Sequence, residues 1–358
     1  MPSPYYDLTG TKKVPRVERH FTFVRPLAAP TTTQSSEDFM GPPVREFLSG
    51  IIDYAGLFPP ARLPFGQAIR NYARYGVGED SWMLGRFVCP AAKLGELEQF
   101  SGELIQEGKP LAVAALGRGG ATPEEFLAGL QADLDAIALL RKKLGPRATV
   151  DVLETRLPAF MLGKSSALCM HEATNMVRAQ APYVNQYFEI PIDDQWREAM
   201  SSLINGLSEA RQPTEGDRAV GFKLRTGGLE AAAFPSTAQV VQALKVCRDK
   251  SVPFKATAGL HHPIRQFDAD LKTMAHGFLN VFGAGILAYA CNLREDQIAK
   301  MIEDESAENF VFSNEAFKWN EFGASTAEIT AARREMMISF GSCSFEEPRD
   351  DMRALGWI

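Results

Sequence analysis

The stretch from residue 219 to residue 260 decides the fold, because it reads as one strand, helix, strand unit. It begins with AVGFKLRTGG (219–228), continues through PSTAQVVQALKVCRDK (235–250) and ends with PFKATAGL (253–260). The two outer segments are short apolar runs bounded by glycine and proline, which is typical of buried strands. The middle segment has apolar residues at helical spacing. A helical crossover of this kind joins neighbouring parallel strands.

The same alternation extends over most of the chain. The other apolar runs are IIDYAGLF (51–58), MLGRFVCP (83–90), PLAVAALG (110–117), ATVDVLET (148–155), VNQYFEIPI (184–192) and FLNVFGAGI (278–286). The helical segment 123–145 has Thr122 as a capping residue, Pro123 in its first turn and Gly145 at its exit. Eight buried runs that alternate with helices favour a closed (β/α)8 TIM barrel. An open sheet is the alternative, but the turn at 55–64 lacks a GxGxxG motif.

The barrel is expected to span residues 46–295, with a further segment on each side. Residues 1–45 are rich in proline, threonine and serine and have no sustained period, so they predict a flexible or extended N-terminal arm. Residues 296–358 predict a C-terminal helical extension that packs on the barrel.

Composition narrows the possible partners and the compartment. The 358 residues include 38 Lys and Arg against 44 Asp and Glu, and this net charge of −6 argues against nucleic acid as a partner. No apolar run reaches the roughly 18 residues of a membrane-spanning helix. The N-terminus lacks the apolar segment of a signal peptide, so we expect a cytoplasmic protein without a membrane partner. Five cysteines without CxxC spacing fit reduced thiols.

Candidate site residues lie late in the runs, because active sites of barrels form at the C-terminal ends of the strands. Lys223 and Lys255 come from neighbouring strands. Two ammonium groups in one barrel mouth would repel each other, and this repulsion favours the neutral amine that Schiff-base formation requires. Structural ion pairs with carboxylates such as Asp151 and Glu189 are the alternative. The other polar residues late in the runs are Asp53, Cys89, Glu154, Arg225, His261 and His262.

The segments KLRTGG (223–228) and KATAGL (255–260) resemble the two lysine strands of the class I deoxyribose-phosphate aldolases. Six further segments resemble other strands of that family in the same order, so the resemblance covers residues 51 to 288. They are IIDYAGLFPPA, RFVCPA, LAVAALG, TVDVLE, FEIPI and VFGAG. The resemblance implies a lyase of the aldolase type that acts on a small carbonyl compound, phosphorylated or carboxylated, without a cofactor.

The resemblance also implies a role for individual residues. Lys223 would be the Schiff-base nucleophile, Lys255 would lower its pKa, and Asp151 would relay protons with a water molecule. The remaining positions would contact the substrate. Asp53 and Cys89 would line the pocket, and Thr226, Gly227 and Gly259 would hold a phosphate through backbone N–H groups. Apart from the resemblance, we expect Glu189, Arg225, His261 and His262 to add further substrate contacts.

The sequence departs from the family at the phosphate site. Gly285 and Ile286 replace a pair of serines, and Arg225 stands where the family has a small residue. Arg225 could bind an anion, a carboxylate included, through its guanidinium fork, or form an ion pair with Glu189 or Glu154.

Two other functions remain open at this point. His261 or His262, together with acidic residues, could hold a divalent cation in a metal-dependent lyase or hydrolase, although no HxH or HExxH spacing is present. The simpler interpretation is a turn histidine held by Pro263. A third alternative is that one histidine acts as an acid or base toward the substrate. The weakened phosphate motif also fits a non-catalytic barrel that binds a small anion. We expect a homo-oligomer, with a dimer as the default.

Overall fold

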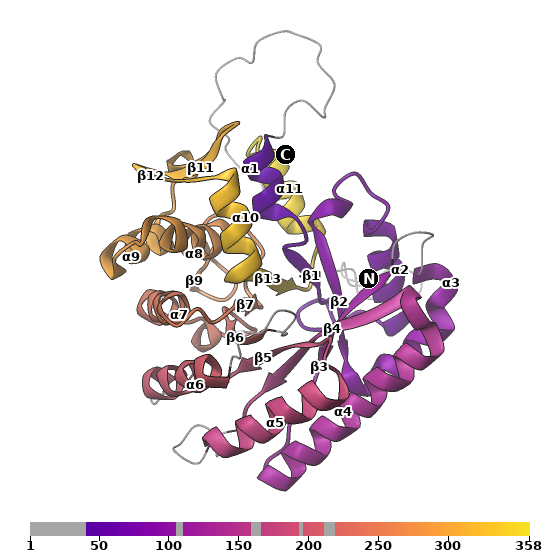
Figure 1. Cartoon of the computed structure of the whole chain (residues 1–358). Coiled ribbons are helices and arrows are strands. Elements are labelled where there is room, and N and C mark those ends of the chain that lie inside the picture. The colour runs from indigo at the N-terminus through magenta and orange to yellow at the C-terminus, as the bar shows by residue number, and fades with distance from the viewer. Residues whose placement is uncertain (1–40, 105–109, 159–165, 193–195, 211–218) are drawn as a thin grey trace, which may run out of the picture. The chain divides into compact units, whose positions relative to one another are not determined.

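Eight parallel strands close into a barrel in the order β1-β13-β7-β6-β5-β4-β3-β2 (Figure 1). The computed structural model describes residues 41–104, 110–158, 166–192, 196–210 and 219–358. The chain is therefore an α/β protein with the fold of a (β/α)8 barrel. The barrel strands are β1 (Ile52–Tyr54), β2 (Leu84–Pro90), β3 (Leu111–Leu116), β4 (Ala148–Arg156), β5 (Asn185–Glu189), β6 (Val220–Arg225), β7 (Phe254–Thr257) and β13 (Met337–Ser342).

Helices surround the barrel, and some of them begin at side-chain caps. The Thr122 hydroxyl accepts a hydrogen bond from the Glu125 backbone N–H at 3.2 Å, and Ser236 and Gln239 form a capping box. The helices are α1 (Pro42–Leu48), α2 (Phe65–Tyr75), α3 (Ser101–Leu104), α4 (Pro123–Leu144), α5 (Ser166–Gln180), α6 (Trp196–Ala210), α7 (Thr237–Asp249), α8 (Phe278–Cys291), α9 (Glu295–Glu303), α10 (Thr326–Glu335) and α11 (Glu346–Ala354).

The eighth strand is not the predicted one. Residues 278–286 lie in helix α8, and β13 closes the barrel between β7 and β1. Helix α8 is buried from Phe278 to Ala288, so it is apolar on all its faces and its sequence resembles a buried strand. A Cβ atom on Gly285 would lie 2.2 Å from Met337 Sδ. The glycine therefore lets helix α8 approach β13, and it does not belong to a strand end.

The predicted barrel boundary at residue 295 is wrong for the same reason. Between α8 and the last barrel strand the chain forms α9, a three-stranded sheet and α10 outside the barrel. The strands of this sheet are β10 (Phe310–Phe312), β11 (Ala316–Trp319) and β12 (Phe322–Ser325). It then returns to the barrel as β13. Only α11 and the last residues follow the final barrel strand. A short hairpin of β8 (Gln266–Asp268) and β9 (Thr273–Ala275) precedes helix α8.

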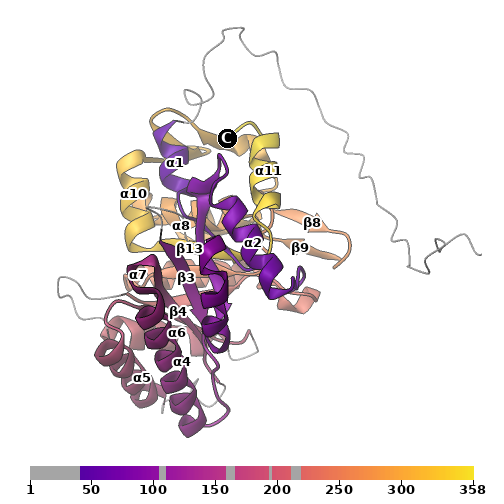
Figure 2. The ribbon, with the colours of Figure 1, turned by 90° about the vertical axis from the view of Figure 1, so that its right-hand side faces the viewer.

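Residues 1–40 of the predicted N-terminal arm lie outside the described residues. Its last part is helical, because α1 spans Pro42–Leu48. Helix α1 lies beside α10, almost 300 residues later in the chain (Figure 2). The Thr330 hydroxyl donates to Glu46 at 2.9 Å, and the rings of Phe47 and Phe317 are 4.9 Å apart. The first described helix therefore packs outside the barrel against α10 and β11, which precede the last barrel strand.

The apolar core has two parts. The larger part lies between the strands and the helices, and a small group inside the barrel contains Ala55, Val88, Ala114, Val152 and Tyr187. Charged side chains occupy much of the remaining barrel interior. No helix in the described part of the chain is long and apolar enough to cross a membrane.

Candidate active site

Strand register brings the two lysines and a glutamate together. Lys223 on β6 is the Cα partner of Lys255 on β7, and Glu189 on β5 is the partner of Lys223. Side chains of register partners on neighbouring strands point to the same face of a sheet. All three side chains therefore lie inside the barrel, and all three are buried.

Glu154 of β4 bridges the two lysines. One carboxylate oxygen lies 2.7 Å from Lys223 Nζ, and the other lies 3.1 Å from Lys255 Nζ. Lys223 has a second carboxylate, Glu189, at 3.1 Å, and the other oxygen of Glu189 accepts from Arg225 Nε at 3.1 Å. Each ammonium group therefore has two acidic partners, since Lys255 also contacts Asp53.

Asp53 of β1 extends the network to the far side of the barrel. Its carboxylate contacts Lys255 Nζ and accepts a hydrogen bond from the Ser339 hydroxyl of β13 at 2.7 Å. It also accepts the backbone N–H of Arg86 at 2.7 Å. The Arg86 guanidinium of β2 binds Asp151 with two bonds, of 2.7 Å and 2.6 Å.

These contacts join eight charged groups into one chain of alternating sign. In order they are Asp151, Arg86, Asp53, Lys255, Glu154, Lys223, Glu189 and Arg225. The formal charges of the four positive and four negative groups add to zero. A buried charge is tolerated when it is paired and hydrogen-bonded, so the alternation explains how the interior accommodates these side chains. The chain of alternating charges ends at Glu189 and Arg225, which are the last residues of their strands.

The protonation states follow from this pairing. Burial would lower the pKa of Lys223, but Glu154 and Glu189 raise it above its ordinary value. Burial would raise the pKa of Glu154, but the two lysines lower it to about 2. Lys223 is therefore an ammonium group at neutral pH, and the predicted neutralisation of one lysine by the other is wrong. The alternative of structural ion pairs holds for Lys223 with Glu189, but Asp151 contacts neither lysine.

The predicted role of Asp151 as a proton relay to Lys223 has no support in the geometry. Asp151 lies three residues before Glu154 on β4, about 10 Å earlier along the strand. Its carboxylate is bound by Arg86. Glu154 occupies the place beside the lysines that the resemblance implied for Asp151.

Cys89 does not line the interior of the barrel. Side chains alternate along β2, so Val88 points inward and Cys89 points into the core between strands and helices. Burial raises the pKa of the Cys89 thiol to about 12. Cys89 is therefore a small core residue.

The three residues of the predicted phosphate site are explained by packing between two loops. The Thr226 hydroxyl donates to the backbone oxygens of Thr257 and Ala258. A Cβ atom on Gly227 would lie 2.7 Å from Gly259 Cα, and Gly259 has a φ of +76°. These positions hold the ends of β6 and β7 together, so the sequence motif has a structural cause.

Arg225 and the two histidines have separate acidic partners. The Arg225 side chain is 42% exposed at the end of β6 while its Nε binds Glu189. Both histidines contact helix α11. The Nδ1 atom of His261 lies 2.9 Å from a carboxylate oxygen of Glu347, and the Nδ1 atom of His262 lies 2.5 Å from one of Asp351. Over the ranges that the structure describes, no group of three or more His, Cys, Asp and Glu side chains is placed to hold a metal ion.

Two members of the network were missed in the sequence. Arg86 lies four residues before the end of β2, on the same face of the strand as Val88 and on the opposite face from Cys89. The alternation of side chains along the strand therefore indicated that Arg86 points into the barrel. Ser339 belongs to MISFGS (337–342), which was not predicted as a strand at all. Glu154 was named as a polar residue late in its run and as a possible partner of Arg225, but not as a partner of the two lysines.

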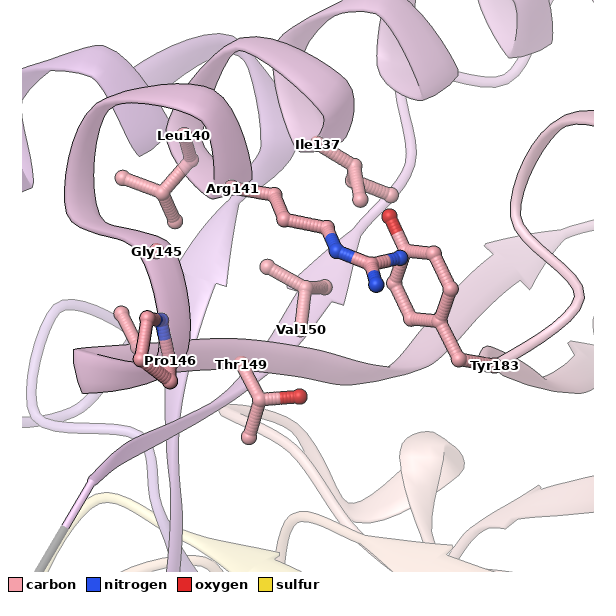
Figure 3. Close-up of a pocket in the computed structure, with 9 residues that line it drawn as sticks. Ile137, Leu140, Arg141, Gly145, Pro146, Thr149, Val150 and Tyr183 are labelled. Atoms are coloured by element: carbon pink, nitrogen blue, oxygen red, sulfur yellow. The ribbon is translucent and has the colours of Figure 1, made fainter.

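A surface hollow of about 420 Å³ lies away from this network. It is lined by α4, the start of β4 and Tyr183 (Figure 3). The Arg141 guanidinium stacks over the Tyr183 ring at 4.0 Å from its centre. Thr149 and Val150 place the hollow at the N-terminal half of β4, whereas the network reaches the C-terminal ends of β5 and β6.

Comparison with known proteins finds similar solved structures but no similar sequence family. No family model matches the chain, and no curated protein sequence matches it. Among solved structures, "QR15, an Aldolase" is similar over 62% of this chain and 83% of its own chain, with 10% sequence identity and a TM-score of 0.41.

Proposed function

We propose that the chain is a carbon–carbon lyase of the class I aldolase type, in which Lys223 forms a Schiff base with a small carbonyl compound. The observation that carries the proposal is the position of Lys223 between the carboxylates of Glu154 and Glu189. An amine flanked by two proton acceptors has the groups that Schiff-base formation needs.

Lys223 is the better candidate of the two lysines. It is 4% exposed, whereas Lys255 is fully buried. Lys223 also shares Glu189 with Arg225, whose partly exposed guanidinium lies at the end of the strand. Active sites of (β/α)8 barrels lie at this end. In this proposal Arg225 binds a carboxylate or phosphate of the substrate.

The activation differs from the one expected from the sequence. One carboxylate, Glu154 or Glu189, takes a proton from the ammonium group, and the freed lone pair of Nζ attacks the carbonyl carbon. A proton moves from nitrogen to the former carbonyl oxygen, which gives the carbinolamine. The protonated carboxylic acid then returns its proton to the hydroxyl group, water leaves and the iminium forms. The iminium accepts the electron pair of the cleaved carbon–carbon bond.

Borohydride trapping tests the proposal. The protein is incubated with acetaldehyde, pyruvate or dihydroxyacetone phosphate, reduced, and analysed by intact mass and peptide mapping. We expect an adduct on Lys223 with at least one of them. Because the pKa of Lys223 is raised, the rate of trapping should increase with pH between 7 and 10.

The matched variants are Lys223→Arg and Lys245→Arg. The first keeps a positive charge between Glu154 and Glu189 but removes the nucleophile, and it should abolish the adduct. Lys245 is a surface lysine on α7 that pairs with Asp249, and its replacement should leave trapping unchanged. A wild-type protein that forms no adduct on Lys223 with any of the compounds would overturn the proposal.

The closed network favours a second candidate, a non-catalytic barrel. Every member of the alternating chain has an opposite charge beside it, which is how a purely structural ion network is built. In this case Arg225 binds an anion that is released unchanged. Stabilisation of the protein by phosphate or pyruvate without any adduct would favour this candidate over the lyase.

A further inference from the structure

A second group of reactive side chains lies at the end of the last barrel strand. Cys343 directly follows β13, and its sulfur is 4.0 Å from His261 Nε2. The other ring nitrogen of His261 lies 2.9 Å from a carboxylate oxygen of Glu347 on α11. The imidazole of His261 therefore faces the thiol with one ring nitrogen and the carboxylate with the other.

This order of groups suits activation of a thiol. A nucleophile, a base and a third group that orients the base form the arrangement that activates cysteine in proteins. Cys343 also lies two residues before Phe345, the N-cap of the nine-residue helix α11. A helix N-terminus and a neighbouring imidazolium both favour the thiolate.

The surroundings of His261 favour its charged form. Burial would lower the pKa of His261, but the hydrogen bonds to Cys343 and Glu347 raise it to about 10. Other titratable groups near this site include Tyr54, whose pKa is raised mainly by burial and further by Cys343 and Glu346. They also include His262, which helps His261 to lower the pKa of Glu347. An imidazolium at neutral pH leaves the nearby sulfur with a positive partner.

We propose that Cys343, His261 and Glu347 form a peroxide-sensitive thiolate site. The Cys343 thiolate attacks one oxygen of a hydroperoxide, so a sulfur–oxygen bond forms and the oxygen–oxygen bond breaks. The sulfur is oxidised by two electrons to the sulfenic acid, and the peroxide is reduced. His261 gives its proton to the departing oxygen, which leaves as water when the oxidant is hydrogen peroxide. Cys343 is only partly exposed, which suits an oxidant of this size.

The first test is the rate of alkylation by iodoacetamide at pH 7, measured for each cysteine by peptide mapping. Cys291 is the internal reference, because it is more exposed and burial raises its pKa. An ordinary thiol is only a few per cent thiolate at this pH, so we expect Cys343 to react at least about tenfold faster than Cys291. Hydrogen peroxide followed by dimedone should label Cys343.

Glu347→Gln and Asp351→Asn are the matched variants, since both change a carboxylate on α11 that holds a histidine. Only Glu347 orients His261, so E347Q should slow the alkylation of Cys343 several-fold while D351N should not. His261→Asn tests the base without any change in α11 and should remove the tenfold advantage. Equal rates for Cys343 and Cys291, or equal effects of E347Q and D351N, would overturn the proposal, as would dimedone labelling that avoids Cys343.

Discussion

Replacement of Glu154 by glutamine tests the chain of alternating charges most directly. The amide keeps the shape of the side chain, but Lys223 and Lys255 lose the carboxylate that they share. Lys223 keeps Glu189 and Lys255 keeps Asp53, so each ammonium group retains one partner. The barrel interior then carries one uncompensated positive charge.

The magnitude follows from the pKa of Glu154. Burial would raise it, but the two lysines lower it from 4.5 to about 2 in the folded protein. A pKa difference of this size between the folded and unfolded states corresponds to a contribution of about 3 kcal/mol to the free energy of unfolding. Removal of one partner of a buried ion pair costs about 3 to 5 kcal/mol, which agrees. We expect Glu154→Gln to lower the free energy of unfolding by about 3 kcal/mol at pH 7.

The pH dependence has a definite sign. The pKa of Glu154 is lower in the folded state, so the unfolded state binds more protons between pH 4.5 and about 2. The stabilisation is complete above pH 4.5 and is lost as the pH falls through this window. The difference in stability between the wild type and the variant should therefore narrow by about 1.4 kcal/mol between pH 7 and pH 3.5.

Urea denaturation at both pH values, followed by circular dichroism, measures this difference. Glu98→Gln is the control, because Glu98 pairs with Lys143 on the surface and its side chain is 47% exposed. Its loss should stay within about 1 kcal/mol. A loss of less than about 1 kcal/mol for Glu154→Gln, or a difference that does not narrow at pH 3.5, would refute the reasoning.

Three further predictions concern packing, geometry and assembly. Gly285→Ala places a methyl group against Met337 and should lower the free energy of unfolding by about 1 to 3 kcal/mol. In the control Gly206→Ala in α6, the new methyl group meets nothing within 4 Å, so stability should stay the same or rise by up to about 1 kcal/mol. Equal midpoints of thermal unfolding for the two variants would contradict the tight contact of α8 and β13. Arg86→Lys loses the two-bond contact with Asp151 and should cost about 1 to 3 kcal/mol in urea denaturation; an unchanged midpoint would show that the fork is unimportant. Light scattering should give a dimer, and a monomeric mass would refute that expectation.

The two proposals place different chemistry at the same end of the barrel. In the first proposal Lys223 loses a proton to one of its carboxylates before it reacts, whereas in the second the sulfur of Cys343 reacts beside the ring of His261. Their tests are independent, because borohydride reports on the lysine and iodoacetamide on the cysteine. Failure of one proposal leaves the other standing.

Seven of the eight barrel strands were predictable from the sequence, because burial on both faces makes a parallel strand a short apolar run. The cap at Thr122 was predictable for a similar reason, since a helix start depends on neighbouring residues. The positions of Lys223 and Lys255 on neighbouring strands also followed from the order of the runs. These features depend on residues close together in the chain.

Other features depended on contacts between distant residues. Helix α8 is apolar all round because strands and helices cover it on every side, so no sequence period separates it from a strand. The charge on Lys223 was mispredicted because its pKa depends on which carboxylates the barrel places beside it. Strand order showed that two lysines meet, but only the tertiary structure decided that Glu154 stands between them. Electrostatic energy depends on distances of a few ångströms in space, and these are fixed when the barrel closes.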